Sequence, residues 1–180
     1  MKRTDYLKVV LILPGNVLIT IPLLIYFFTR NSYSYDLTNP PSFLFYVAML
    51  FLTLGLFLAI WSVRTFYTKG GDGTPAPWKP VSNLIIYGPY RYVRNPMILG
   101  VVVLLLFEAT FFSSKPLLLW ALVFFIVNIF YFKVFEEKQL IKRFGPDYEN
   151  YKENVPMFFP KFTFGYNSLS TFKSSRFVSG

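Results

Sequence analysis

Two short polar segments stand out in a chain that is otherwise largely apolar. One is the strip at residues 87–97, where tyrosine, arginine, asparagine and proline follow each other closely. The other is an adjacent acidic pair, Glu136 and Glu137, at the end of a later apolar stretch. Arginine binds carboxylates, whereas carboxylates and aromatic faces bind cations. The two segments therefore predict a pocket for a zwitterionic or cationic small molecule.

The strip contains Pro96, a residue that suits the first turn of a helix. Helix N-termini attract anions, so we expect Arg94, Asn95 and this helix start to hold a ligand carboxylate. A simpler interpretation stays open, because basic and aromatic residues also anchor helix ends at a membrane surface. Under that interpretation Asn95 is only the N-cap of the helix.

The acidic pair has a simpler interpretation as well. Lys133 lies three and four residues before the two acids and could pair with either of them on a solvated helix end. Against this, ionisable residues at the end of a membrane span tend to be functional.

Cysteine and histidine are both absent from the 180 residues, which removes several reaction classes. A thiolate nucleophile, an imidazole base and a zinc site built from these ligands are excluded. We expect no metal site. Any chemistry must use carboxylate, phenol, amine or guanidinium groups, the backbone, or a bound cofactor.

The composition indicates an all-α integral membrane protein. Hydrophobic residues make up 54% of the chain and charged residues 15%, which is more apolar surface than a soluble domain of this size buries. Four apolar stretches predict transmembrane helices, at residues 9–28, 42–63, 96–112 and 117–132. The first two are long enough to cross a hydrocarbon core of about 30 Å, whereas the last two are shorter.

Polar and helix-breaking residues in these stretches carry further predictions. Pro14, Gly15, Asn16 and Pro22 predict a kinked first helix, packed against a neighbour that satisfies the freed backbone groups. Residues 113–116 form a tight turn, so the last two stretches make an antiparallel helical hairpin. We expect Glu108 to reach solvent or to pair with Lys115, and Asn128 to hydrogen-bond to another helix.

The C-terminal part predicts a cytoplasmic amphipathic segment. Helical periodicity continues beyond the fourth stretch until Gly145 and Pro146 stop it. The residues that follow, up to position 160, are expected to lie on the membrane surface. Residues 1–161 then form one transmembrane domain, and residues 162–180 form a mobile cytoplasmic tail.

The distribution of basic residues predicts the orientation. Of the 18 lysines and arginines, all except Arg30 and Lys115 lie before the first stretch, between the second and third, or after the fourth. The positive-inside rule therefore places both termini and the central loop of a multi-pass protein in the cytoplasm. The net charge of +9 fits this topology and contact with anionic lipids. We expect no nucleic-acid partner, because no soluble basic module is present.

The order of motifs resembles the isoprenylcysteine carboxyl methyltransferase and phospholipid methyltransferase family of integral membrane enzymes. The resemblance covers residues 42–160. It rests on a glycine-rich loop at 71–77, the strip, a hydrophobic hairpin, the acidic pair and the segment 144–151. It implies S-adenosylmethionine as the cofactor. Asn95 is a departure, because the family shows Arg-His-Pro where this chain has Arg-Asn-Pro.

The resemblance also implies roles for individual residues. The cofactor-binding positions are Gly71, Gly73, Tyr90, Tyr92, Val93, Arg94, Asn95, Pro96, Glu136 and Glu137. Two positions are assigned to catalysis. Glu137 could serve as the base for an amine acceptor, and Arg143 could hold an acceptor carboxylate.

We therefore predict S-adenosylmethionine-dependent methyl transfer to a lipid-linked or hydrophobic acceptor at the cytoplasmic membrane face. A carboxylate of the isoprenylcysteine type is slightly favoured because it is already ionised, whereas a phospholipid amine requires a base. Two alternatives stay open. One is a sterol-type membrane reductase that uses a nicotinamide cofactor, and the other is a non-catalytic membrane lipid-binding protein.

Overall fold

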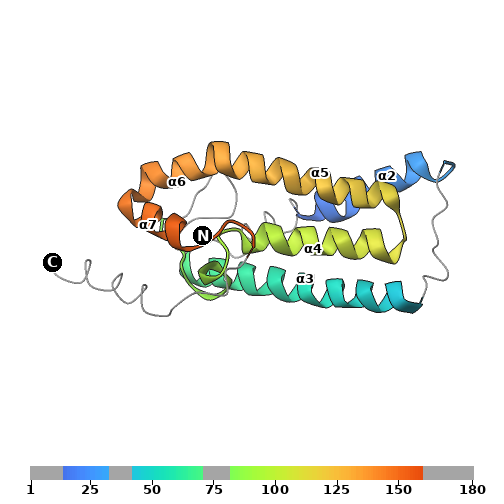
Figure 1. Cartoon of the computed structure of the whole chain (residues 1–180), viewed down its shortest axis with the longest axis horizontal. Coiled ribbons are helices and arrows are strands. Elements are labelled where there is room, and N and C mark those ends of the chain that lie inside the picture. The colour runs from blue at the N-terminus through green and yellow to red at the C-terminus, as the bar shows by residue number, and fades with distance from the viewer. Residues whose placement is uncertain (1–13, 33–41, 71–81, 160–180) are drawn as a thin grey trace.

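The computed structural model describes residues 14–32, 42–70 and 82–159, and all regular structure in this part of the chain is helical. Elements η1 and η3 are π-helical turns, and η2 is a 3₁₀ turn. In chain order the elements are η1 (Asn16–Thr20), α2 (Ile21–Thr29), α3 (Ser42–Lys69), η2 (Gly88–Arg91), α4 (Pro96–Phe111), α5 (Lys115–Tyr131), η3 (Phe132–Glu136), α6 (Glu137–Phe144) and α7 (Pro146–Asn154). Helix α4 lies between α3 and α5, and α6 and α7 extend beyond one end of this layer (Figure 1).

Two helices are long and apolar enough to cross a membrane. They are Phe43–Lys69, of 27 residues, and Lys115–Phe144, of 30 residues. Large apolar side chains along both helices are exposed, including Phe57 at 61% and Ile126 at 63%. The core helices of a soluble protein bury such side chains, so this exposure fits contact with lipid. The predicted all-α class is confirmed for the described residues, and two helices have the length of a membrane span.

The lengths of the apolar helices differ from the prediction. The second stretch continues as helix to Lys69. The predicted continuation of the helix beyond the fourth stretch is confirmed, because α5 runs through η3 and α6 to Phe144, which gives a helix long enough to cross a membrane. The third ends at Phe111 and is short, as expected. The first is described only from residue 14, and its helical part, Asn16–Thr29, is shorter than a membrane-crossing helix.

Small residues allow α3 and α4 to pack closely. A Cβ atom added to Gly100 of α4 would lie 3.0 Å from the backbone nitrogen of Ala59, and one added to Gly55 of α3 would lie 2.8 Å from the Leu104 side chain. At Gly100 the close atom belongs to the backbone, which shifts less easily than the Leu104 side chain that faces Gly55. Small residues therefore favour this helix separation, most clearly at Gly100. The close packing fixes the first turns of α4, and with them the end of the strip, against α3.

A side chain of α5 bonds to a backbone carbonyl that the π-helical turn η1 leaves without its helical partner. The N–H of Ile21 bonds to the carbonyl of Asn16, five residues back, so the carbonyl of Val17 loses its usual partner. The residue that could reach this carbonyl in a π-helix is Pro22, which has no N–H. The indole Nε1 of Trp120 donates to it instead, over 3.3 Å. The prediction that a neighbour satisfies the backbone freed by Pro22 is confirmed.

The helical hairpin between α4 and α5 is also confirmed. Ser113 turns the chain with a φ of +46°. Ser114 is the N-cap of α5, and its side chain accepts a hydrogen bond from the N–H of Leu117 over 3.3 Å. This cap replaces one of the helical partners that the first turn of α5 lacks.

The prediction for Asn128 is wrong, and of the two alternatives predicted for Glu108 the ion pair is not found. Asn128 does not join two helices, because its Nδ2 donates to the carbonyl of Phe124 in its own helix, over 2.7 Å. Glu108 forms no ion pair with Lys115 within the described residues, and its Oε2 is buried without a hydrogen-bond partner. Glu108 as a whole is partly buried, so its side chain is neither fully exposed nor fully enclosed.

The chain reverses direction after α6. Gly145 ends the helix with a φ of +54°, a conformation that favours glycine, and Pro146 begins α7. The reversal buries Tyr148, Tyr151 and Val155, at 1%, 5% and 1% exposure, against α6 and residues just before the strip. The expectation that this segment lies on the membrane surface stays a prediction. The apolar side chains of the segment pack on the protein itself.

Candidate functional site

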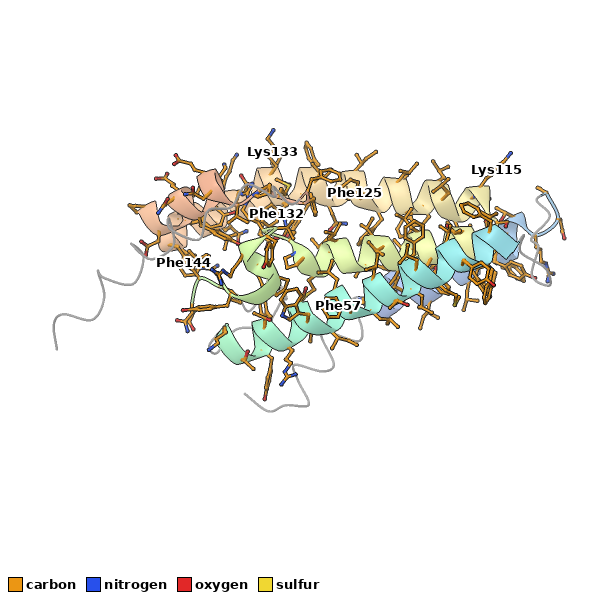
Figure 2. All side chains as sticks on the ribbon, turned by 60° about the horizontal axis from the view of Figure 1, so that its bottom comes forward. Phe57, Lys115, Phe125, Phe132, Lys133 and Phe144 are labelled. Atoms are coloured by element: carbon orange, nitrogen blue, oxygen red, sulfur yellow. The ribbon has the colours of Figure 1, made fainter. Side chains whose placement is uncertain are left out.

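The π-helical turn η3 determines which acid of the pair faces the bundle. The N–H of Glu137 bonds to the carbonyl of Phe132, five residues back. In an α-helix, residues five apart point about 140° away from each other, whereas a π-helical turn brings them near the same face. Phe132 and Glu137 are accordingly both buried, at 2% and 4% exposure. Lys133 is exposed and projects away from the bundle (Figure 2).

Arg94 lies at the centre of a buried cluster. Its Nη1 donates to Oε1 of Glu137 over 2.5 Å and to the hydroxyl of Tyr148 over 3.2 Å. Its Cζ lies 5.9 Å from the centroid of the Phe132 ring. The Arg94 side chain is 8% exposed, so solvent screens the ion pair little. The basic strip and the acidic pair, which are predicted to form one pocket, therefore meet through Arg94 and Glu137.

Lys152 of α7 pairs with the second oxygen of Glu137. Its Nζ lies 2.7 Å from Oε2, and its side chain is 41% exposed. Glu137 thus has one cation on each oxygen, one from the strip and one from α7. The simpler interpretation of a solvated helix end paired with Lys133 is wrong for Glu137, because this carboxylate is buried and its partners come from other elements.

Backbone hydrogen bonds join the strip to the segment that follows α7. The N–H of Arg94 donates to the carbonyl of Pro156 over 2.9 Å, and the N–H of Asn95 donates to the carbonyl of Met157 over 3.2 Å. These bonds fix the backbone at the positions whose side chains could bind a ligand. A site supported in this way is held in place before the ligand arrives.

Two buried donors in the strip have no acceptor among the residues that the structure describes. They are Nε of Arg94 and Nδ2 of Asn95, a residue that is 8% exposed. Asn95 occupies the N-cap position of α4, but its side chain makes no capping hydrogen bond. A role as helix cap therefore does not account for its amide group. Buried donors without acceptors reduce stability, and two adjacent ones at a helix start fit an anionic oxygen ligand such as a carboxylate.

Burial of the cluster keeps its tyrosines protonated. Burial raises the pKa of Tyr148 to about 12; the charge and hydrogen bond of Arg94 oppose the rise, and the charges of Glu137 and Glu136 add to it. Burial also raises the pKa of Tyr151. Neither phenol is a base at neutral pH.

Most of the predicted strip residues surround the cluster. Tyr90, Val93 and Pro96 are buried. Tyr92 is 54% exposed and contributes to the surface instead. Gly71 and Gly73 lie outside the described residues, so their cofactor role stays a prediction.

Glu136 and Arg143 lie at the edge of the cluster. Glu136 is partly buried and, among the residues that the structure describes, forms neither a hydrogen bond nor an ion pair. Arg143 is near enough for its positive charge to act on the carboxyl group of Glu136. Arg143 itself is exposed, with its Cζ 5.8 Å from the centroid of the Phe144 ring. The ligand roles of both residues stay predictions.

The residues that α7 contributes were missed from sequence. Tyr148 and Lys152 are four residues apart, so they share one face of α7 and reach the cluster together. One signal was available, because the reversal at Gly145 and Pro146 directs any following helix back toward the strip.

Comparison with known proteins places Arg94 and Glu137 in a recognised family region, whereas Tyr148 and Lys152 lie just beyond its end. Residues 43–147 match the family model described as phospholipid methyltransferase. Over 75 residues the chain is 35% identical to "Methanethiol S-methyltransferase 2" of Bradyrhizobium diazoefficiens, covering 40% of this chain and 27% of that protein. Over 74 residues it is 34% identical to "Methanethiol S-methyltransferase" of Pseudomonas deceptionensis, covering 39% of this chain and 26% of that protein. The chain thus spans about a quarter of the length of these curated relatives.

Proposed function

Because this chain belongs to the phospholipid methyltransferase family, we propose that it transfers a methyl group from S-adenosylmethionine to a hydrophobic or lipid-linked acceptor. The observation that carries the proposal is the buried cluster at the start of α4, where Arg94 and Asn95 keep donors without acceptors. Both residues lie inside the region that matches the family.

The residues of the cluster fit the charges of S-adenosylmethionine. Its carboxylate would accept hydrogen bonds from Arg94 Nε and Asn95 Nδ2, and its cationic groups suit the acidic pair and the Phe132 ring. Asn95 donates without titrating, so the family's histidine is not needed for this contact. When bound, the cofactor supplies a methyl group whose carbon–sulfur bond breaks as the acceptor's lone pair bonds to carbon, leaving a neutral thioether.

The protein's contribution to such a displacement is alignment and exclusion of water. The strip is suited to both tasks. Its backbone is held by the carbonyls of Pro156 and Met157, and its Arg94 side chain is almost fully enclosed. The absence of histidine from the chain does not weaken this mechanism, because no proton transfer is required when the acceptor is already ionised.

The cluster favours an acceptor that ionises near neutral pH. Glu137 is paired on both oxygens and Tyr148 stays protonated, so neither is free to act as a base. An amine is protonated at neutral pH and must lose a proton before it reacts, whereas a carboxylate is already an anion. A thiol must also lose its proton, but with a pKa of about 8.5 a fraction of it is present as thiolate without help from a base. We propose a carboxylate acceptor, or a thiol that reacts through this thiolate fraction, and the names of the two relatives indicate a sulfur acceptor for those proteins. The exposed Arg143 is the candidate for holding it.

We propose that the site faces the cytoplasm and that the first apolar helix and α4 complete a bundle of four spans. Lys115 lies at the opposite end of the long helix from Phe144 and the cluster (Figure 2). In the described part of the chain, most basic residues belong to the elements around the cluster, as the positive-inside rule requires of the cytoplasmic side.

Titration of S-adenosylmethionine into the purified, detergent-solubilised chain tests the proposal. We expect saturable binding that S-adenosylhomocysteine displaces. A nicotinamide dinucleotide titrated under the same conditions should give no saturable signal. Saturable binding of the dinucleotide instead would favour the reductase alternative, and no binding of either compound would favour a non-catalytic protein.

A further inference from the structure

Three phenylalanines form an aromatic cluster between α5 and the segment that follows α7. The ring of Phe125 contacts those of Phe158 and Phe159, with centroid separations of 5.1 Å and 6.3 Å. Phe158 is 3% exposed, whereas Phe159 is 74% exposed. The aromatic cluster therefore has a buried part that fixes its position and one large apolar ring that is mostly exposed.

The aromatic cluster is connected to the proposed ligand site from two directions. The carbonyl of Met157, the residue before the two C-terminal phenylalanines, accepts the hydrogen bond from the N–H of Asn95 over 3.2 Å. Phe125 belongs to the same long helix as Phe132, whose ring centroid lies 5.9 Å from Cζ of Arg94. The aromatic cluster thus adjoins the two residues to which we assign the carboxylate of the methyl donor.

The surface around the aromatic cluster is apolar. Phe125 precedes Phe132 along the helix by about 10 Å, at a rise of about 1.5 Å per residue. It lies between Phe132 and Lys115 (Figure 2). Residues 116–132 contain no charged side chain, and Ile126 beside the aromatic cluster is 63% exposed. This surface contrasts with the charged groups at the start of α4.

Such an arrangement suits a molecule with a charged reacting group at one end and an apolar chain at the other. The reacting carboxylate or thiolate must come close to the donor that we place at Arg94 and Asn95. A chain attached to it can extend along α5, where contact with Phe125 and Phe159 removes apolar surface from water. A short acceptor makes no such contact.

We propose that Phe125, Phe158 and Phe159 form the surface that receives the apolar chain of the methyl acceptor, so that the preferred acceptor carries a long apolar chain. This inference rests on the proposed function and names the acceptor class. Phe158 and Phe159 lie beyond residues 43–147, so the family match does not assign them this role. The two relatives are named for methanethiol, which has a single carbon, so chain length is the property that would distinguish this protein from them.

The first test measures methyl transfer from S-adenosylmethionine by the full chain in one detergent. The acceptors are two thiols, methanethiol and dodecanethiol, and two carboxylates, the S-methyl and S-dodecyl forms of N-acetylcysteine. We expect kcat/KM for the dodecyl member of a pair to exceed that for the methyl member by roughly tenfold or more, because even one methylene in an apolar contact can change kcat/KM by about that much. Phe159→Ala should lower this ratio by roughly tenfold.

The control variant Phe130→Ala removes the same side chain from another exposed position of α5. Phe130 is 64% exposed and five residues after Phe125, so the two side chains point about 140° apart. Its ratio should equal that of the parent. Partition of the dodecyl compounds into micelles affects all three proteins alike, so it cancels in the comparison. The ligand-free unfolding temperature of Phe159→Ala should stay close to that of the parent, because the ring is mostly exposed.

A second test locates the chain directly. A dodecyl acceptor with a photoreactive diazirine within its chain is irradiated with the parent protein, and mass spectrometry identifies the labelled residues. We expect adducts on the aromatic cluster or on the neighbouring turns of α5. Adducts confined to α3 would overturn the inference.

The first test separates failure of the inference from failure of the proposed function. The inference is overturned if the parent methylates the short and the long acceptor equally well, if Phe159→Ala keeps the ratio of the parent, or if Phe130→Ala lowers the ratio as much. A parent that methylates none of the four compounds would refute the proposed carboxylate or thiol acceptor, and the inference with it.

Discussion

The hydroxyl of Tyr151 donates to the carbonyl oxygen of Tyr90 over 2.6 Å, across 61 residues of sequence. Tyr151 is buried in α7, and Tyr90 lies in the strip that begins α4. This bond ties the C-terminal helix to the segment that we propose binds the methyl donor. Tyr151 thus supports the backbone of the strip without being one of the residues that we propose contact the ligand.

Replacement of this tyrosine should destabilise the protein. Tyr151→Phe removes one buried hydrogen bond and little volume, so we expect a loss of about 1 to 3 kcal/mol in the free energy of unfolding. Thermal or denaturant unfolding in detergent measures it. Tyr131→Phe, at an exposed position of α5, should cost far less. Equal stability of the two variants would show that the bond to Tyr90 contributes nothing.

The ion pair between Arg94 and Glu137 should behave as one unit. Arg94→Ala leaves a buried carboxylate with a single cation, and we expect a loss of about 3 to 5 kcal/mol in the free energy of unfolding. Glu137→Ala should cost a similar amount, and the double variant should cost much less than the sum of the two. Unfolding of all three variants completes the double-mutant cycle. Strictly additive losses would contradict the direct pairing.

Close packing of α3 and α4 should make Gly100 sensitive to a single methyl group. Alanine in a helix is normally more favourable than glycine by about 1 kcal/mol. Gly100→Ala should nevertheless destabilise the protein, because its Cβ would lie 3.0 Å from the backbone of Ala59. Gly15→Ala is the matched control, since no neighbouring segment of the described residues lies within 4 Å of the added Cβ. A stabilising effect at both positions would mean that α3 and α4 can move apart enough to accommodate the added methyl group.

Much of this architecture could be predicted from the sequence. Proline at the start of α4, the serine turn before α5 and Gly145 at the end of α6 all act within a few residues, so local pattern identified them. The contact between the strip and the acidic pair was predictable because their charges are opposite, and charged groups near a membrane are stabilised by pairing.

Other features could not be predicted, because they depend on contacts between distant segments. The π-helical turn that selects Glu137 over Glu136 has no local sequence signal. Lys152 and Tyr148 contact Glu137 and Arg94 only because α7 folds back against the strip, and the local sequence does not specify these contacts. The side chain of Asn128 could equally bond across or along a helix, and the structure shows the second.

The proposed orientation can be tested by labelling single cysteines, since the chain contains none. Ser113→Cys lies in the exposed turn between α4 and α5, and Glu153→Cys lies on the exposed side of α7. In intact cells an impermeant thiol reagent should label the first variant and not the second. The second should react only after the membrane is permeabilised. Labelling of Glu153→Cys in intact cells would place the cluster on the outer side.

The most direct measurement is the dissociation constant of S-adenosylmethionine for the parent, for Asn95→Ala and for Asn83→Ala. Asn95 holds a buried amide donor without an acceptor, whereas Asn83 is an exposed asparagine just before the strip. We predict that Asn95→Ala raises the dissociation constant by roughly tenfold, the effect of one buried hydrogen bond, without lowering the ligand-free unfolding temperature. Asn83→Ala should bind like the parent. If Asn95→Ala also binds like the parent, the strip is not where the methyl donor is held, and the assignment of Arg94 and Asn95 to its carboxylate is wrong.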